Sequence, residues 1–387
     1  MIKDKIDFMK ETSFTLQEIS SQPKLWLETF ESVSDKRETI AAFINKVCGI
    51  NNLQVILTGA GSSAFIGEIL QFSFQRNTGM PVKAVSTTDL VTHPDSYFEK
   101  KAPVLLVSFA RSGDSPESVA VFDLAENLTG EVYHLVISCS REGKLAKMAA
   151  NKENACVFLL PEKANDKALA MTSSFTSMAL AGLLISDINN IEKRQGIIEQ
   201  LSGLGELVLT KFSKALAAAA DLDFRRIVFI GSGPLKGTAR ESHLKVLELT
   251  DGQIACQYES FLGFRHGPKA FIDKSTLLIY IFSSDPYVHQ YEADLVRSIN
   301  ETEDFIYSIG IGQNTNDLEK LRLNLLIPLT LNEGKMEDDL FAIVSVLPAQ
   351  LLGFYKSQSL GLIPDSPSQN GGIHRIVQGV NLYPFNH

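Results

Sequence analysis

The chain has 387 residues, of which 44% are hydrophobic and 21% charged, a composition typical of globular proteins and not of disordered ones. Its formal net charge of −9, without any run of basic residues, argues against a nucleic-acid or anionic membrane partner. The charged N-terminus lacks the apolar segment of a signal peptide, and we judge the longest apolar runs too short to span a membrane. We therefore expect a cytoplasmic protein.

Four cysteines are present, and none of them forms the CxxC pair that zinc sites commonly use. They stand among apolar residues, so we expect free, buried thiols in a reducing compartment. No metal site and no organic cofactor is signalled. The cysteines are Cys48, Cys139, Cys156 and Cys256.

Residues 1–45 have apolar spacings typical of helices, with Pro23 expected to end the first of them. A short apolar run, Gln54–Thr58, predicts a buried strand. It leads through Gly61, Ser62 and Ser63 into a helix, so hydroxyl groups and helix N-terminal amides would point at one place. The spacing is neither GxGxxG nor a P-loop, and we expect a single small phosphate group here.

A second strand is predicted over residues 102–109, and Arg111, Ser112 and Ser115 follow it before a helix that begins near Pro116. These residues fit either a simply capped helix or part of an anion site. Two serine-rich strand-to-helix turns in one sheet form a crevice at the carboxyl ends of the strands, and this favours the anion site.

Strands over residues 133–138 and 156–160 are expected to complete a four-strand α/β core. The next helix opens with Thr172 and Ser173, whose hydroxyls could again donate to an anion. Helix capping by one of these side chains alone is the open alternative.

The succession of strand, glycine-rich turn and helix then begins again, which indicates an internal duplication. Gly59 and Gly231 are 172 positions apart, and the same offset relates Leu106 to Leu278 and Ile137 to Ile309. The offset between the fourth strands of the two halves is four residues shorter. We expect two tandem α/β domains, each a mainly parallel sheet flanked by helices. The expected boundaries are a helical arm (1–45), a phosphate-binding domain (46–205), a domain with the reactive groups (206–360) and a tail (361–387).

The helix after the second glycine turn contains Lys245 and Glu248, which three-residue spacing places on one face. The loop beyond it contains His266, just before Gly-Pro. A carboxylate, an ammonium and an imidazole could together move a proton beside a carbonyl. A solvated ion pair and an ordinary loop histidine are the alternatives. The apolar side of this helix is expected at Leu244, Leu247, Leu249 and Ile254.

The tail combines many turn-forming residues with β-branched and aromatic ones, so we expect it to fold back over a site or a neighbour. It offers His374, Arg375 and Gln378 as site candidates, and a packing role fits them equally well.

The chain resembles the sugar isomerase (SIS) domain family, and most closely its AgaS-type proteins, which are described as galactosamine-6-phosphate deaminase/isomerases or tagatose-6-phosphate ketose/aldose isomerases. It is also similar to the isomerase half of glucosamine-6-phosphate synthase. The motifs that carry the resemblance are spread over nearly the whole chain in the family order: ILTGAGSSAFIG, SFARSGDSPESV, AMTSSFTSM, IGSGPLKGTARESHLKVLELTDG, GFRHGPKAFID and RIVQGVNLYP.

The resemblance implies a flavodoxin-like three-layer αβα domain in each half and a role for each matching residue. Glu248 matches the family's base, Lys245 its neighbouring lysine, and His266 the histidine of ring opening, which a second subunit often supplies. It therefore also implies a homodimer or a dimer of dimers. The residues that match the sugar-phosphate turns are Gly61, Ser62, Ser63, Arg111, Ser112, Ser115, Thr172 and Ser173.

The tail departs from the synthase, because it lacks the synthase's sugar-contacting lysine, and the amidotransferase domain is also missing. We therefore expect release of ammonia from an amino-hexose 6-phosphate, with galactosamine 6-phosphate preferred, and a phosphosugar as the small-molecule partner. Phosphosugar isomerisation without deamination is the alternative. A phosphosugar-sensing regulator is a remote one, since the N-terminal arm has no basic DNA-binding face.

Overall fold

The computed structural model describes residues 13–100, 102–302, 304–331, 334–377 and 379–385. They divide into two compact units. Unit 1 takes the described part of Met1–Lys24, together with Lys167–Thr172 and Gly196–Asn370. Unit 2 takes Leu25–Asp166, Ser173–Gln195 and the described part of Gly371–His387.

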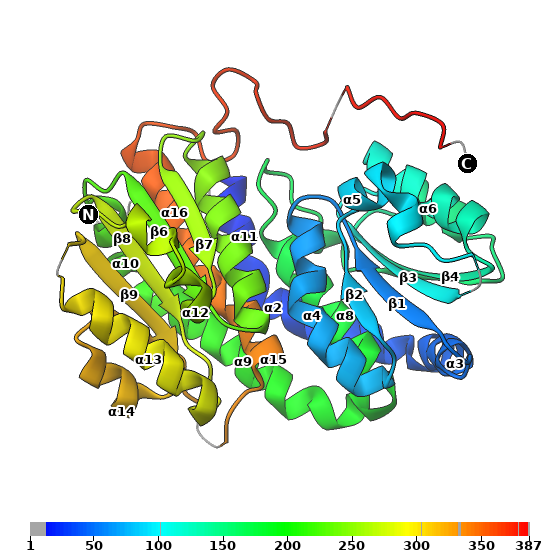
Figure 1. Cartoon of the computed structure of the whole chain (residues 1–387), viewed down its shortest axis with the longest axis horizontal. Coiled ribbons are helices and arrows are strands. Elements are labelled where there is room, and N and C mark those ends of the chain that lie inside the picture. Colours follow the sequence, from blue (N-terminus) through cyan, green and yellow to red (C-terminus); the bar gives the residue numbers. More distant parts are fainter. Residues whose placement is uncertain (1–12, 101, 303, 332–333, 378, 386–387) are drawn as a thin grey trace. The chain divides into compact units, whose positions relative to one another are not determined.

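Unit 2 is built on a parallel sheet of five strands in the order β2-β1-β3-β4-β5 (Figure 1). The central strands are buried on both faces, which explains their nearly unbroken apolar sequences. The strands are β1 (Gln54–Thr58), β2 (Val82–Ala84), β3 (Pro103–Ala110), β4 (Glu131–Ser138) and β5 (Ala155–Leu159).

Helices α4 and α8 pack against each other on one face of this sheet, where Gly182 lies close to Leu70 and Phe109. Helices α5 and α6 cover the other face, around Leu106 and Val121. The helices are α3 (Arg37–Cys48), α4 (Ser62–Thr78), α5 (Thr87–Thr92), α6 (Pro116–Leu128), α7 (Lys144–Ala149) and α8 (Ser173–Ser186).

Unit 1 repeats the arrangement with a parallel sheet in the order β10-β9-β8-β6-β7. Its strands are β6 (Arg226–Gly231), β7 (Ala255–Glu259), β8 (Thr276–Ile281), β9 (Tyr307–Gly312) and β10 (Leu325–Pro328). Its helices are α9 (Gln195–Leu207), α10 (Ser213–Ala220), α11 (Pro234–Leu249), α12 (Phe261–Phe264), α13 (Pro286–Asn300), α14 (Thr315–Leu318), α15 (Asp338–Ser345) and α16 (Leu347–Ser359).

The two sheets confirm the expected tandem α/β fold, because each reads second-first-third-fourth-fifth along its own chain. Ile56 pairs with Leu106 in one sheet and Val228 with Leu278 in the other, so the first and third strands keep the offset of 172. The next strands, β4 and β9, do not correspond at the expected offset. Val107 pairs with Leu135, and its counterpart Ile279 pairs with Ile309, so Ile309 is equivalent to Leu135 and not to Ile137.

The expected four-strand core was wrong by one strand in each half, since β2 and β7 were not predicted. Both are edge strands and only partly buried, with Lys83 in one and Gln257 and Glu259 in the other. These two edge strands have polar side chains and no continuous apolar run, so hydrophobicity alone does not reveal them.

Helix α2 (Phe14–Asp35) runs through Pro23, which was expected to end it. Beyond this proline the helix is held by burial of Trp26, whose Nε1 donates to Thr176 Oγ1 at 3.1 Å in unit 2. Tertiary packing thus offsets the usual cost of a proline inside a helix.

The buried side of α11 also differs from the expectation. Leu244 and Leu247 are half-buried, whereas Glu241 and Lys245 are fully shielded. Helices α15 and α16 and strands β6 and β7 all pack against α11. Ile254 is buried, but it lies beyond the end of the helix.

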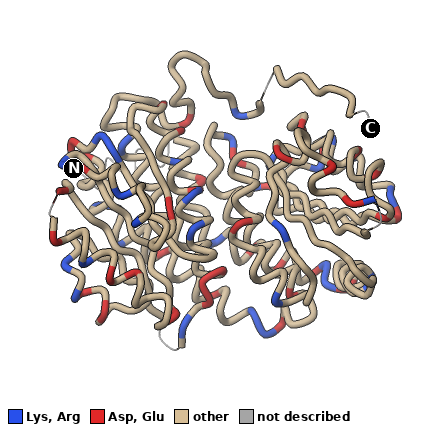
Figure 2. Tube along the Cα trace, viewed as in Figure 1, with Lys and Arg blue, Asp and Glu red and all other residues tan. Residues whose placement is uncertain are grey.

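One stretch, Asp338–Ser359, is long and apolar enough to cross a membrane by length and composition, so the expectation that every run is too short was wrong. Its apolar window is completely buried inside the structure, as in the core helices of many proteins. Acidic and basic residues are mixed over both units (Figure 2).

All four cysteines are free, as expected. Cys139 and Cys156 are buried, but Cys48 and Cys256 are only half-buried. Burial raises the pKa of each of these thiols, so they remain protonated at neutral pH.

Candidate functional site

In unit 2 the predicted phosphate turns follow β1 and β3, which are adjacent and parallel. Thr58 pairs with Ser108, so both strands end at the same edge of the sheet. The strand order reverses direction between these two strands, the place where open α/β sheets bind ligands. The sequence-predicted turns therefore stand at the carboxyl edge of one sheet.

The first turn is shaped by Gly61, which precedes α4 with a φ of 57°. A non-glycine residue rarely adopts this conformation. Ser62 and Ser63 form the first turn of the helix and are each 4% exposed. The N-terminal amides of a 17-residue helix lie at the same place and favour an anion.

The second turn contains Arg111, which is 8% exposed, and Ser112, whose Oγ accepts from the Asp114 amide at 3.2 Å. Ser115 stands at the N-cap of α6 as expected, but its side chain makes no capping hydrogen bond. Simple capping by its hydroxyl therefore does not account for this serine. Gly143 supports the turn, because a Cβ there would lie 2.1 Å from the Ser112 carbonyl oxygen.

At the start of α8 the structure places an acidic residue that the sequence analysis missed. The buried carboxylate of Asp166 accepts from the amides of Ser173 and Ser174 at 3.0 and 2.9 Å and from both hydroxyls at 2.5 Å. The N-terminus of α8 thus already has an anion of its own, and the Ser173 hydroxyl is engaged with it. Thr172 belongs to unit 1, where its carbonyl accepts from Gln350 Nε2 at 3.4 Å.

The three tail candidates have different outcomes. Arg375 lies in unit 2 and hydrogen-bonds to Asn165 and Asp166, while Gln378 lies outside the described residues. His374 is exposed.

In unit 1, α11 carries a compact group of charges. The Lys245 ammonium lies 2.6 Å from Glu248 Oε2 and 3.4 Å from Glu241 Oε1. The Lys245 and Glu241 side chains are fully buried, and that of Glu248 is 23% exposed. This burial does not fit a solvated surface ion pair, which was the alternative interpretation.

Glu241 was not selected from the sequence, although it lies four residues before Lys245 and therefore on the same helix face. Each of the two carboxylates reduces the cost of burying the ammonium. Glu248 is the carboxylate that solvent, and hence a small molecule, can reach. The group can accept a proton at Glu248 and stabilise negative charge at Lys245.

His266 also belongs to unit 1, in the loop between α12 and a short 3-10 turn. Its backbone amide donates to Gly263 at 3.0 Å, and Gly267 beside it has a φ of 124°. Its side chain is exposed and, within the described residues, makes no hydrogen bond or ion pair. The ring is therefore accessible, and no hydrogen bond or ion pair among the described residues of this unit joins it to Lys245 or Glu248.

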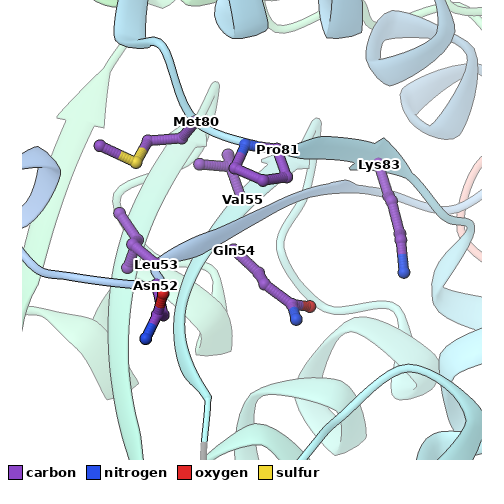
Figure 3. Close-up of a pocket in the computed structure, with 7 residues that line it drawn as sticks. All are labelled: Asn52, Leu53, Gln54, Val55, Met80, Pro81 and Lys83. Carbon is purple, nitrogen blue, oxygen red and sulfur yellow. The ribbon is translucent and has the colours of Figure 1, made fainter.

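A cavity of about 510 Å³ lies at the other end of the unit 2 sheet (Figure 3). Asn52, Gln54, Pro81 and Lys83 line it, at the amino ends of β1 and β2. None of the predicted site residues lines it. Among the described residues, no group of three His, Cys, Asp or Glu side chains could hold a metal ion.

Comparisons with known proteins show the family to which the chain belongs. The SIS domain model matches residues 50–185. The chain is 40% identical over 375 residues to D-galactosamine-6-phosphate deaminase AgaS of Shewanella sp. (strain ANA-3), covering 96% of this chain and 92% of that protein. It is 38% identical over 376 residues to D-galactosamine-6-phosphate deaminase AgaS of Escherichia coli, covering 96% of each.

A solved structure extends the likeness to three dimensions. Tagatose-6-phosphate ketose/aldose isomerase from Escherichia coli superimposes with a TM-score of 0.88 at 35% identity. The match covers 97% of this chain and 98% of that one.

Proposed function

This chain belongs to the AgaS family of SIS-domain proteins, and we propose that it catalyses the isomerising deamination of an amino-hexose 6-phosphate. The substrate we infer is D-galactosamine 6-phosphate, which with water gives D-tagatose 6-phosphate and ammonia. The reaction is thus a carbon–nitrogen hydrolysis coupled to an aldose-to-ketose shift. The observation that carries the proposal is the shielded ammonium–carboxylate pair of Lys245 and Glu248.

In the proposed reaction, unit 2 binds the phosphate group. Arg111 supplies a guanidinium, and the α4 N-terminus supplies backbone amides. Neutral donors come from the hydroxyls of Ser62, Ser63, Ser112 and Ser115. Binding the non-reacting phosphate fixes the sugar, which lowers the entropic cost of reaching the reactive geometry. Ser173 is a less direct candidate, because its hydroxyl already donates to the Asp166 carboxylate. Thr172 is also less direct, because it belongs to unit 1.

Unit 1 supplies the reacting groups. His266 exchanges protons at the ring oxygen and the C1 hydroxyl, which opens the ring. Glu248 removes the C2 proton that the C1 aldehyde has acidified, and Lys245 stabilises the charge that develops on O1. The product of this step is an enolamine.

Proton return to C1 then converts the enolamine into a C2 iminium ion. Water adds to C2, ammonia leaves, and the ketose 6-phosphate remains. These steps use the residues of the chain and water, and the proposal includes no cofactor.

A second candidate is aldose–ketose isomerisation of a phosphosugar without deamination, which the name of the Escherichia coli structure favours. It shares the ring opening and the C2 deprotonation. Only ammonia release distinguishes the two reactions, since both depend on Glu248 and His266.

The proposal also includes a homodimer or a dimer of dimers, in which the exposed His266 serves its own chain or a neighbour. Light scattering on the purified protein tests the oligomeric state. A cytoplasmic location is part of the proposal and is supported by the four free cysteines.

The decisive experiment measures ammonia and ketose from galactosamine 6-phosphate, with glucosamine 6-phosphate in parallel. We expect equal amounts of both products from the galacto epimer. Glu248→Gln should abolish them, and Glu319→Gln, which changes an exposed carboxylate of the same unit, should not. Exchange between tagatose 6-phosphate and its aldose without ammonia would establish the second candidate instead.

A further inference from the structure

The tail segment of unit 2 is fastened to the rest of that unit through Arg375. Its Nε donates to the Asp166 carbonyl at 2.9 Å, and its Nη2 donates to the same carbonyl at 2.5 Å and to Asn165 Oδ1 at 2.8 Å. A planar guanidinium can make these bonds together, since its donors point in fixed directions.

The same residue is linked in the opposite direction to the predicted phosphate turn. The Arg111 guanidinium donates through Nη2 to the backbone carbonyl of Arg375. The side chain of Arg375 therefore holds its own backbone in place, and that backbone orients Arg111. Three segments far apart in the sequence meet here: the turn after β3, residues 165–166 and the tail.

Asp166 is itself held in place by hydrogen bonds. The Asp166 carboxylate caps α8 through Ser173 and Ser174, and it is fully buried. The carbonyl that receives Arg375 is thus attached to the start of a buried helix. Burial raises the pKa of the Cys139 thiol, and the charges of Asp166, Arg111 and Arg375 also act on it.

We propose that Arg375 is a positioning residue, which orients the Arg111 guanidinium for the phosphate group of the substrate. The proposal rests on the proposed role of Arg111 in binding that phosphate. Arg375 touches no reacting atom in this arrangement. Its contribution is to hold Arg111 in a binding geometry before the ligand arrives, which spares the ligand that ordering cost.

A coupling of this kind must work in both directions. If docking of the tail favours phosphate binding at Arg111, bound phosphate must stabilise the docked tail by the same factor. A purely structural clamp would hold the tail equally well with and without an anion. This reciprocity gives the inference a readout that does not depend on turnover.

The tail offers a direct assay, because Arg375 is the last lysine or arginine in the sequence. Trypsin must bind the Arg375 side chain to cut after it, and in the docked tail that side chain is engaged with Asn165 and Asp166. Cleavage releases residues 376–387, which mass spectrometry detects. We expect slow cleavage of the intact protein and about tenfold slower cleavage with saturating inorganic phosphate.

The test variant is Arg375→Lys, which keeps the charge and the trypsin site but loses the forked donors. We expect faster release of the peptide, about tenfold weaker phosphate binding by calorimetry, and a matching rise in KM with kcat little changed. The control is Arg194→Lys, because Arg194 makes a similar forked contact with Asp187 elsewhere in unit 2. It should behave like the intact protein.

Two results would overturn the inference. One is equal phosphate affinity in the intact protein and Arg375→Lys. The other is a cleavage rate that phosphate does not change, although calorimetry shows that phosphate binds. Neither depends on ammonia release, so an inactive protein with phosphate-protected cleavage would contradict the proposed reaction and still support the role of Arg375.

Discussion

The Lys245 ammonium lies 2.6 Å from the Glu248 carboxylate on α11. The contact is not an ordinary surface ion pair, since the Lys245 side chain is completely buried. Glu241 Oε1 lies 3.4 Å from the same ammonium. A buried cation between two carboxylates is costly to assemble and adds little net stability. Its presence therefore favours a chemical role for the group.

Lys245→Met should separate stability from function in this group. It leaves the buried Glu241 without its cation, and we expect the free energy of unfolding to fall by about 3 to 5 kcal/mol. Deamination should fall by at least about 100-fold, because the charge that stabilises O1 is lost. Urea unfolding and an ammonia assay measure the two effects.

The double variant Lys245→Met/Glu241→Gln provides the control. Removing both buried charges should restore most of the stability but none of the activity. If the single variant were as stable as the parent, Lys245 would not compensate the charge of Glu241.

The parts of the fold that could be predicted are those in which burial forces an apolar pattern. Strands β3 and β8 show it, and their repeat at 172 positions revealed the tandem fold. Edge strands β2 and β7 carry polar side chains in partly exposed positions, so their sequences look like loops.

The site residues could likewise be predicted only where a local sequence pattern reveals them. Helical spacing was enough to place Lys245 beside Glu248. The same spacing would also have pointed to Glu241, which was not selected, and it could not show that Lys245 and Glu241 are fully buried. Contacts between distant segments leave no periodic signal. Asp166 caps α8 from a loop, and Arg111 reaches Arg375 across 264 positions, so both required the structure.

His134 should make unit 2 sensitive to acid. The side chain is fully buried, stacks on Phe122 with ring centres 3.7 Å apart, and bonds to Glu126 at 3.1 Å. Burial lowers its pKa to about 4, although Glu126 opposes the shift. In the unfolded chain the pKa returns to about 6.5, so below that pH the unfolded state binds more protons.

Stability should therefore fall between about pH 6.5 and pH 4, by about 2 to 3 kcal/mol from this group. His134→Phe retains a ring against Phe122 and removes the proton site. Urea unfolding at pH 7.5 and 4.5 should show a smaller loss in this variant than in the parent. His93→Phe, at an exposed position, should keep the parent's pH dependence. Equal losses in all three proteins would contradict the assignment.

Asp365 should anchor the start of α2 within unit 1. Its carboxylate accepts from the amides of Phe14 and Thr15 at 2.9 and 2.8 Å and from the hydroxyls of Ser13 and Thr15 at 2.8 and 2.7 Å. Burial opposes ionisation, but the bonds from Thr15 and Ser13 hold the pKa of Asp365 below its ordinary value. The carboxylate is therefore charged at neutral pH.

Asp365→Ala should cost about 1 to 2 kcal/mol, as the loss of a helix cap typically does. Hydrogen exchange of a peptide from the start of α2 should become about 5 to 30 times faster. Asp294→Ala, which breaks an exposed ion pair with Arg297, should leave that exchange unchanged. Unchanged exchange in Asp365→Ala would show that α2 is held by its other contacts.

Gly143→Ala should disturb the turn after β3, which packs against Gly143 at Ser112. The added Cβ would meet the Ser112 carbonyl oxygen at 2.1 Å, so that turn or the start of α7 must move. We expect a loss of about 1 to 3 kcal/mol in stability from overpacking. Inorganic phosphate should bind about tenfold more weakly, equivalent to about 1.4 kcal/mol, because Ser112 leaves its place beside Arg111.

Gly203→Ala is the matched control, since a Cβ at this position in α9 meets nothing within 4 Å. Alanine favours a helix over glycine by about 0.5 to 1 kcal/mol, so this variant should be slightly more stable than the parent. Its phosphate affinity should be unchanged, because it leaves the turns of unit 2 untouched. Calorimetry on both variants separates a general effect of adding a methyl group from a specific effect at the Ser112 turn. If Gly143→Ala bound phosphate as tightly as Gly203→Ala, the Ser112 turn would not belong to the phosphate site.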